Sequence, residues 1–149
     1  MGSRKSNMAE KIREDRKTKY IARLNNCPTS PRKMRLVADL VRGMDVTKAS
    51  AVLQFTKKHA ARDLEKLLRS AISNFEQKSG ERWEEADLFI KEIMVDGGRV
   101  LKRIQPAPQG RAYRVRKRSN HVTMVLASAN PELNQRLGES NNETSETEA

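Results

Sequence analysis

VDGGRVLKRIQPAPQGRAYRVRKRSNHVTMVL, residues 95–126, is the stretch on which the fold of this chain depends. Its two ends are apolar enough to lie in a protein core, whereas its middle is strongly cationic. No Asp or Glu occurs between Asp96 and Glu132 to offset that charge. Such a segment needs a polyanion beside it, because uncompensated like charges repel one another. The eight cations of the middle are Arg99, Lys102, Arg103, Arg111, Arg114, Arg116, Lys117 and Arg118.

The pattern predicts a long β-hairpin over residues 97–120. Alternate residues of a strand share a face, so Arg114 and Arg116 lie on the same side as Met124 and Leu126. That face changes from guanidinium groups to hydrocarbon along its length. We therefore expect the base of the hairpin to pack on a core and its far half to leave the globule.

Glycine and proline mark both ends of the hairpin. Gly97 and Gly98 permit a bulge or bend at its base, and the segment PAPQG at residues 106–110 has the composition of a turn. With about ten residues in each arm, the hairpin reaches roughly 30 Å. A two-stranded ribbon is barely stable alone in water, so its surroundings must order it. The alternative is a charged hairpin that lies free in solvent.

Composition limits the classes of partner. The net charge of +11 and the pI near 10.2 point to nucleic acid or to an anionic membrane surface. The 149 residues fit one domain with tails. No apolar run approaches the ~18 residues of a membrane span and no secretory segment is present, so we expect a cytoplasmic protein. Cys27 is the only cysteine and His59 and His121 lie far apart, so we expect no metal and no cofactor.

The first predicted helix begins at Ser30-Pro31, where the Ser side chain is expected to cap it, and ends at Gly43. Its opposite side is basic, through Arg32, Arg35 and Arg42 beside Asp39. That side either contacts RNA or is a solvated surface. The residues predicted to form its buried stripe are Met34, Leu36, Val37, Leu40, Val41 and Met44.

Two more helices and two strands complete the prediction. Asp45 is placed to cap a helix over Val46–Gln54, and a long helix over residues 57–78 carries the clearest apolar stripe of the chain. Tyr20–Leu24 and Leu88–Val95 are predicted strands, the second of them central and apolar on both faces. The fold class is therefore α+β, with three helices packed on a small antiparallel sheet and a long protruding β-hairpin.

The two ends of the chain lie outside this domain, which covers residues 20–128. Residues 1–19 form a basic arm, helical near residues 9–17, that either folds on RNA or is disordered. Residues 129–149 form an acidic tail that we expect to be disordered. Trp83 lies among acidic residues that would repel phosphate, so we expect it to serve packing or to lie in an exposed loop.

Several short motifs recur in order between Tyr20 and Leu126. They are RKMRLVADLVRG at residues 32–43, SAISN at 70–74, VDGG at 95–98, LKRI at 101–104, QGRA at 109–112 and KRSNHVT at 117–123. Their order and spacing resemble the L-twenty-two family of the bacterial large ribosomal subunit. The resemblance implies a structural, non-enzymatic protein of the ribosome that binds ribosomal RNA (rRNA), supports subunit assembly and lines the nascent-peptide exit tunnel with its hairpin.

The resemblance also implies partners and contact residues. The partners are large-subunit rRNA, neighbouring ribosomal proteins and, transiently, the nascent peptide, with no membrane and no homo-oligomer. The expected rRNA-binding residues are Arg32, Lys33, Arg35, Arg42, Arg99, Lys102, Arg103, Arg111, Arg114, Arg116, Lys117, Arg118 and His121. The expected tunnel-facing tip is Pro106, Ala107, Pro108, Gln109, Gly110 and Arg111, where Ala107 and Gln109 replace basic residues usual in the family.

Two other functions fit parts of the sequence. The helices on either side of Gly43 imitate a helix-turn-helix of a DNA-binding regulator, but the second of them carries only Lys48 as a cation. An RNA-processing enzyme would need a catalytic set, and the carboxylates Glu84, Glu85 and Asp87 have no basic or nucleophilic partner near them in sequence. Both histidines fit better as neutral side chains at the edge of the core.

Overall fold

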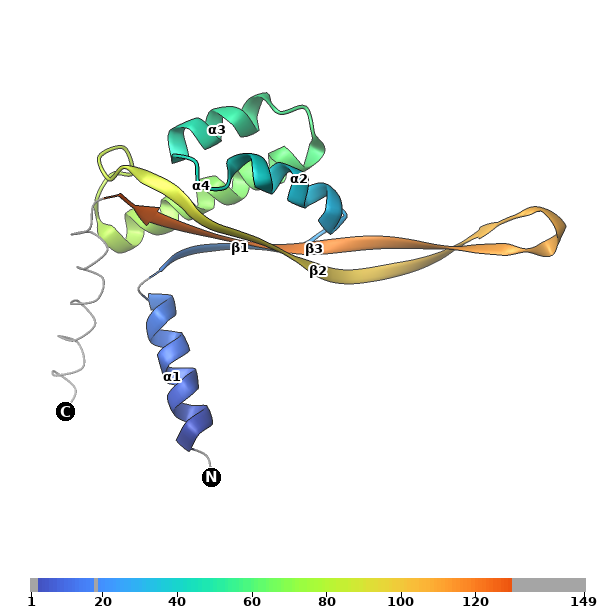
Figure 1. Cartoon of the computed structure of the whole chain (residues 1–149), viewed down its shortest axis with the longest axis horizontal. Coiled ribbons are helices and arrows are strands. Elements are labelled where there is room, and N and C mark those ends of the chain that lie inside the picture. Colours follow the sequence, from blue (N-terminus) through green and yellow to red (C-terminus); the bar gives the residue numbers. More distant parts are fainter. Residues whose placement is uncertain (1–2, 18, 130–149) are drawn as a thin grey trace.

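The computed structural model describes residues 3–17 and 19–129. The helices of residues 31–79 cover one face of a three-stranded antiparallel sheet (Figure 1). The α+β fold class is confirmed. The elements in chain order are α1 (Ser3–Lys17), β1 (Tyr20–Cys27), α2 (Pro31–Val41), α3 (Val46–Phe55), α4 (His59–Ser79), β2 (Leu88–Pro106), the 3-10 turn η1 (Pro108–Gly110) and β3 (Ala112–Ser128).

The strand order is β1-β3-β2, so β3 is the central strand. Leu126 pairs with both Tyr20 of β1 and Ile90 of β2. The prediction that residues 88–95 form a central strand was wrong, because among the described residues β3 is the only strand that pairs with β2, which lies at an edge of the sheet. The other side of β2 makes one isolated bridge, between Phe89 and Asp45. Local sequence pattern gives no information on which strand is flanked on both sides.

A bulge in β2 puts its apolar residues on one face rather than two. Register shifts between Ile90, which pairs with Leu126, and Glu92, which pairs with Val125. One extra residue reverses the alternation, so Ile93 is buried together with Ile90 while Met94 is exposed. The predicted two-sided apolar strand was therefore wrong.

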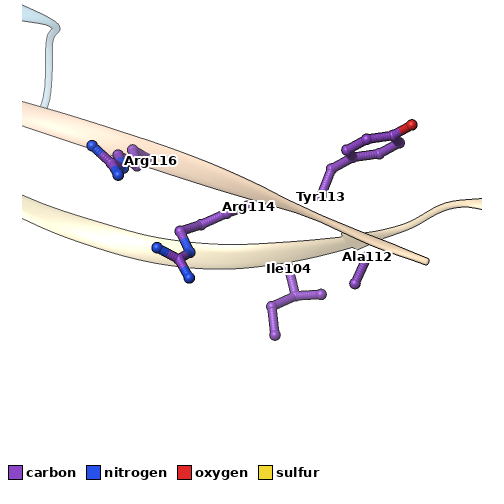
Figure 2. A pocket seen from close by; sticks show the side chains of 5 residues that line it. All are labelled: Ile104, Ala112, Tyr113, Arg114 and Arg116. Atoms are coloured by element: carbon purple, nitrogen blue, oxygen red, sulfur yellow. The ribbon is translucent and has the colours of Figure 1, made fainter.

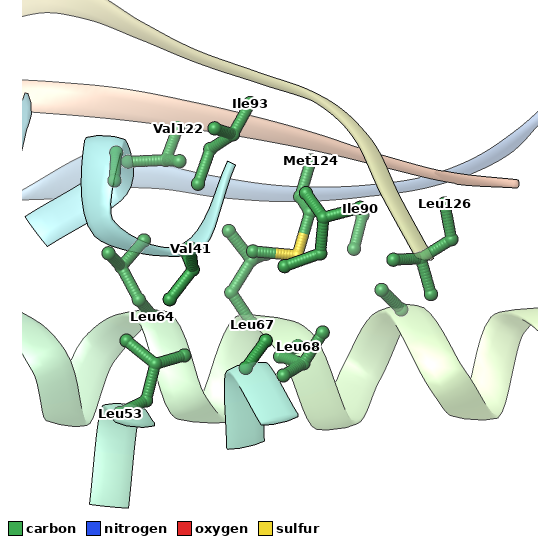
Figure 3. Close-up of a cluster of buried hydrophobic side chains, with 14 of the residues drawn as sticks. Val41, Leu53, Leu64, Leu67, Leu68, Ile90, Ile93, Val122, Met124 and Leu126 are labelled. Atoms are coloured by element: carbon green, nitrogen blue, oxygen red, sulfur yellow. The ribbon is translucent and has the colours of Figure 1, made fainter. Parts of the chain in front are cut away.

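The core lies between that face of the sheet and α4, the longest helix (Figure 3). The predicted apolar stripe of α4 is confirmed, and on its outer side Glu65 and Arg69 form an ion pair of 2.7 Å. Full burial of each Leu or Phe contributes about 1.5–3 kcal/mol, so this core is the main source of stability of the base. Its largest fully buried side chains include Tyr20, Met34, Leu53, Leu64, Leu68, Phe75, Ile90, Met124 and Leu126.

The helix ends follow the predicted chemistry with one exception. Pro31 begins α2, but the Ser30 side chain makes no capping hydrogen bond; its backbone oxygen accepts from the N–H groups of Lys33 and Met34 instead. Asp45 caps α3 as predicted, since its carboxylate accepts from the Thr47 N–H at 3.4 Å. Gly80 ends α4 in the left-handed conformation, with φ of 72°.

The buried stripe of α2 is narrower than predicted. Met34, Val37, Ala38 and Val41 are buried, whereas Leu36, Leu40 and Met44 are 56%, 45% and 37% exposed. The four buried positions already fill the contact of α2 with the sheet and α4, and Leu36 and Leu40 lie on the other side of the helix. The predicted burial of these three residues was wrong.

The basic arm is helical from Ser3 rather than only near residues 9–17. Figure 1 shows α1 pointing away from the sheet, joined to the start of β1. Its described side chains, those of residues 4–13, are all exposed. The acidic tail lies outside the described residues, apart from the exposed Ala129.

Candidate nucleic-acid interface

The far part of the hairpin, residues 99–118, is a two-stranded ribbon that we call the finger. It extends β2 and β3 well beyond the globular base (Figure 1), and its pairing continues from Val100↔Arg118 to Pro106↔Ala112. Every side chain of residues 101–106 and 111–118 is exposed. The finger therefore has no core of its own.

The root of the finger is held by close backbone packing. Register shifts between Gly97 and Val100, which confirms the predicted bulge. A Cβ on Gly98 would lie 3.0 Å from the Oγ of Ser119 and 3.1 Å from its carbonyl oxygen, so glycine permits this approach. The Ser119 hydroxyl donates to the Arg99 carbonyl oxygen at 2.5 Å. These contacts join the two arms where they leave the base.

Polar side chains form hydrogen bonds between the root and the end of β1 with the turn that follows it. Asn120 is fully buried and donates from Nδ2 to the Thr29 carbonyl oxygen at 2.5 Å. The Asn26 N–H donates to Nδ1 of His121 at 3.1 Å. His121 thus lies at the edge of the core as expected, with one ring nitrogen used within the protein, whereas the His59 side chain is mostly exposed.

One face of the finger, which we call the cationic face, concentrates the charge. Lys102 lies directly opposite Arg116 and Ile104 opposite Arg114. Like charges directly opposite each other destabilise a strand pair. In the free protein, repulsion between these cations therefore destabilises the finger. A hollow of about 600 Å³ near the tip is lined by Ile104, Arg114 and Arg116, among others. Figure 2 shows Arg114 close to Ile104 and Arg116 farther along the strand toward the base. The cationic face is formed by Val100, Lys102, Ile104, Arg114, Arg116 and Arg118.

The opposite face, which we call the mixed face, carries Arg103 and Lys117 among apolar side chains. Tyr113 is 63% exposed and projects away from the side that bears Ile104 (Figure 2). An exposed aromatic ring between cations suits stacking on a nucleic-acid base. Sequence reasoning missed Tyr113, although its position between Arg111 and Arg114 as the only aromatic residue of the hairpin was the signal that could have identified it.

A second group of cations gathers where the finger meets β1. Arg99, Lys117 and Arg118 line a hollow of about 470 Å³ together with Asn26 and Pro28. These cations come from both arms, and pairing in the sheet brings them together. The site thus extends from the root of the finger to the hollow near its tip.

Two arginines donate hydrogen bonds to the edge strand β2, Arg35 from within α2 and Arg42 from just after its end. Arg35 donates from Nη2 to the Val95 carbonyl oxygen at 3.0 Å, and Arg42 donates to that of Ile93 at 3.2 Å. Arg42 also forms an ion pair of 2.7 Å with Asp39. An edge strand has carbonyl groups without a strand partner, and these donors satisfy two of them. Arg32 and Lys33 are exposed at the start of α2.

The tip is a tight turn. Gln109 and Gly110 have φ of 63° and 71°, and the Ala107 N–H donates to the Arg111 carbonyl oxygen at 2.9 Å. Of the predicted tip residues only Arg111 is charged. The tip is therefore a nearly uncharged end on two cationic arms. We call these arms, residues 99–105 and 112–118, the shaft.

Residues 3–17 and 19–129 lack two other classes of site. These residues contain no group of three or more His, Cys, Asp or Glu side chains that could hold a metal ion. No helix among them is long and apolar enough to span a membrane. Trp83 is partly buried against the core, so of the two roles expected for it, packing or a place in an exposed loop, the structure shows packing.

In the free protein we expect a protected base and a rapidly exchanging finger, because the finger buries almost no hydrocarbon. Hydrogen exchange followed by mass spectrometry should find the amides of residues 64–75 and 88–95 protected and those of residues 105–113 exchanged early. Addition of large-subunit rRNA should slow exchange in residues 105–113. Equal protection of tip and base in the free chain would contradict this account.

Comparison with known proteins adds independent information. The model of the family described as "Ribosomal protein L22p/L17e" matches residues 22–127. A protein of Flavobacterium johnsoniae named "Large ribosomal subunit protein uL22" is 63% identical over 131 residues, which are 87% of this chain and 96% of that protein. Proteins of the same name from Bacteroides fragilis and Porphyromonas gingivalis are 60% and 55% identical over 128 and 134 residues, covering 86% and 90% of this chain and 94% and 100% of theirs.

Proposed function

We propose, because the chain belongs to the ribosomal protein L22p/L17e family, that it is a structural constituent of the large ribosomal subunit that binds rRNA. It supports subunit assembly through its finger, and it is not an enzyme. The observation that carries the proposal is the exposed finger, whose strands place Lys102 against Arg116 with no acidic residue between Asp96 and Glu132. The dense array of phosphates in RNA offsets charge arranged in this way.

The mechanism is a division of labour between base and finger. The base folds on its own core and positions the root through Gly98, Ser119 and Asn120. The cationic face then neutralises the phosphates that lie against it, and each contact releases counterions from the RNA. RNA thereby supplies the order that the isolated ribbon lacks.

The proposed contacts extend beyond the cationic face. Arg99 and Lys117 bind at the root, Arg103 on the mixed face and Arg111 at the tip. Arg32, Lys33 and the outer side of His121 add contacts on the base. Arg35 and Arg42, which also donate to carbonyl groups of β2, add further contacts to rRNA beside them. Residues 20–128 form the rRNA-binding domain, with the basic arm and the acidic tail as extensions on either side.

The tip is proposed to line the exit tunnel and to meet the nascent peptide transiently. Its uncharged Pro-Ala-Pro-Gln sequence suits a wall past which peptides of any charge must slide. Neighbouring ribosomal proteins are the other partners, and the exposed Leu36 and Leu40 of α2, with Met44 in the turn that follows, offer them an apolar surface. No homo-oligomer enters the proposal.

Replacement of residues 107–111 by Asn-Gly tests the separate roles of shaft and tip. The pair Pro106↔Ala112 remains and a two-residue turn closes it. The finger therefore loses only Arg111 among its cations. Tagged full-length and shortened chains should both sediment with large subunits after a high-salt wash. Translating ribosomes with the shortened chain should respond differently to macrolides or to stalling peptides, because only the tip has changed.

The two halves of this experiment fail separately. A full-length chain that stays at the top of the gradient would refute membership of the subunit. Normal sedimentation of both chains with an unchanged response to macrolides and stalling peptides would refute the role of the tip alone. Competition between duplex DNA and structured rRNA at moderate salt distinguishes the DNA-binding alternative, which predicts that DNA wins.

A further inference from the structure

The turn between α3 and α4 carries the most exposed aromatic side chain of the described residues. Phe55, the last residue of α3, is 81% exposed. Val46, Ala49 and Leu53 form the buried side of α3, and at 100° per residue Phe55 falls almost opposite them. Packing within the protein therefore does not explain a ring at this position.

Cations surround this ring. Phe55 lines an open hollow of about 410 Å³ together with Lys57, Lys58, His59 and Arg62. Glu65 is the acidic residue of that lining, and Arg69 already neutralises it at 2.7 Å. Within the described part of the chain, no ion pair engages Lys57, Lys58 or Arg62. The hollow is thus a net cationic site with an aromatic wall.

The hollow is separate from the finger. α3 packs on α4 and lies on the side of the helical layer away from the sheet, and the α3–α4 turn lies above α2 in Figure 1. The finger leaves from the sheet itself. None of the residues that line the hollow lines either of the finger hollows.

We infer that the α3–α4 turn is a second RNA contact, one that takes a single-stranded segment. A base stacks on the ring of Phe55 while the adjacent phosphates lie against Lys57, Lys58 and Arg62. Proteins that bind single strands use this combination, in which an aromatic surface accepts any base and a cationic groove holds the backbone. A duplex would offer the ring no open base face.

The consequence is that one small protein holds two RNA segments. The finger lies along one segment, and the α3–α4 turn binds an unpaired segment on the helical side of the base. Only the identification of the ligand as RNA rests on the proposed function. The chemistry of the hollow, a ring and cations around an open space, stands without it.

Binding of a fluorescently labelled twelve-residue oligouridine by the full chain tests the inference. Anisotropy is measured in a chain with Arg114, Arg116 and Arg118 changed to Gln, so that binding by the finger is weak. In that background Phe55→Leu should weaken binding about tenfold, because it keeps the hydrocarbon and the charge but removes the ring. Phe55→Trp should bind as well as Phe55 or better.

A charge control and a fold control accompany these variants. Lys57→Gln with Lys58→Gln and Arg62→Gln should weaken binding and reduce its salt dependence, whereas Phe55→Leu should leave the salt dependence unchanged. Circular dichroism should be the same for all variants, since these side chains are exposed.

The outcomes separate this inference from the proposed function. Binding by Phe55→Leu within twofold of its parent, or equal loss in Phe55→Leu and Phe55→Trp, would overturn the second contact. It would leave open a surface for a neighbouring protein at the same place. The proposed function is judged instead by binding of structured rRNA to the unmodified finger, which the oligouridine does not report.

Discussion

Replacing Arg114, Arg116 and Arg118 together by Glu should lower the affinity for large-subunit rRNA by about 10³-fold or more. The three guanidinium groups share the cationic face, and each charge-assisted contact that is lost costs about 1.5–3 kcal/mol. Three such contacts amount to about 4.5 kcal/mol or more, and each 1.4 kcal/mol is a factor of ten. The new carboxylates add repulsion from phosphate. Filter binding or anisotropy at a fixed salt concentration measures the change.

A matched control separates the position of charge from its amount. Glu at Lys48, Lys66 and Lys91 makes the same change in net charge, from +11 to +5, since each replacement removes two units. These three lysines are exposed on α3, α4 and the base of β2, away from the finger. The control should lose less than tenfold. Equal losses in the two triple variants would mean that net charge, rather than the cationic face, determines binding.

Affinity for an rRNA fragment should fall by about 10³- to 10⁵-fold between 50 and 200 mM salt, as expected when six to ten phosphates are neutralised. The finger alone carries eight cations between Arg99 and Arg118, and exposed cations on α2 add to them. The triple Glu variant should show a slope in the logarithmic plot that is shallower by about three contacts. A flat salt response of the unmodified chain would refute phosphate binding.

The hairpin could be predicted from sequence because several local signals agree. Gly97 and Gly98 mark the bulge, and PAPQG marks the turn. The alternation that ends at Leu126 predicts which side chains of the second arm, β3, lie on the same face. The stripe of α4 could be predicted for the same reason, since a 3.6-residue period repeats over five turns. These features depend only on residues close in sequence.

The wrong predictions concern features that are determined by contacts between residues far apart in the sequence. Nothing near residues 88–95 says that β3 separates β2 from β1, and the bulge after Ile90 that puts Ile93 in the core is set by pairing with β3. Leu36 and Leu40 fit a buried stripe in isolation, but the area that the sheet and α4 offer to α2 is filled by Met34, Val37, Ala38 and Val41. Packing area is a property of the whole fold.

The candidate site shows the same division. The cations of the finger were identified by charge alone, because no acidic residue interrupts them. The use of Arg35 and Arg42 by the carbonyl groups of β2 could not be foreseen without the edge position of that strand. Phe55 and Tyr113 were missed because an isolated aromatic residue in a sequence is more often part of a core, and only its exposure shows otherwise.

The central claim is that the finger lies embedded in rRNA, and ultraviolet cross-linking of large subunits that contain this chain tests it most directly. Mass spectrometry of the RNA-linked peptides should find nucleotides attached within residues 99–118, with Tyr113 as a preferred position because its ring stacks on a base. Peptides from the acidic loop around Glu84 and Glu85, whose side chains are exposed, should remain unmodified. Nucleotides linked to α4 or α1 in subunits whose finger peptides are all unmodified would contradict the claim.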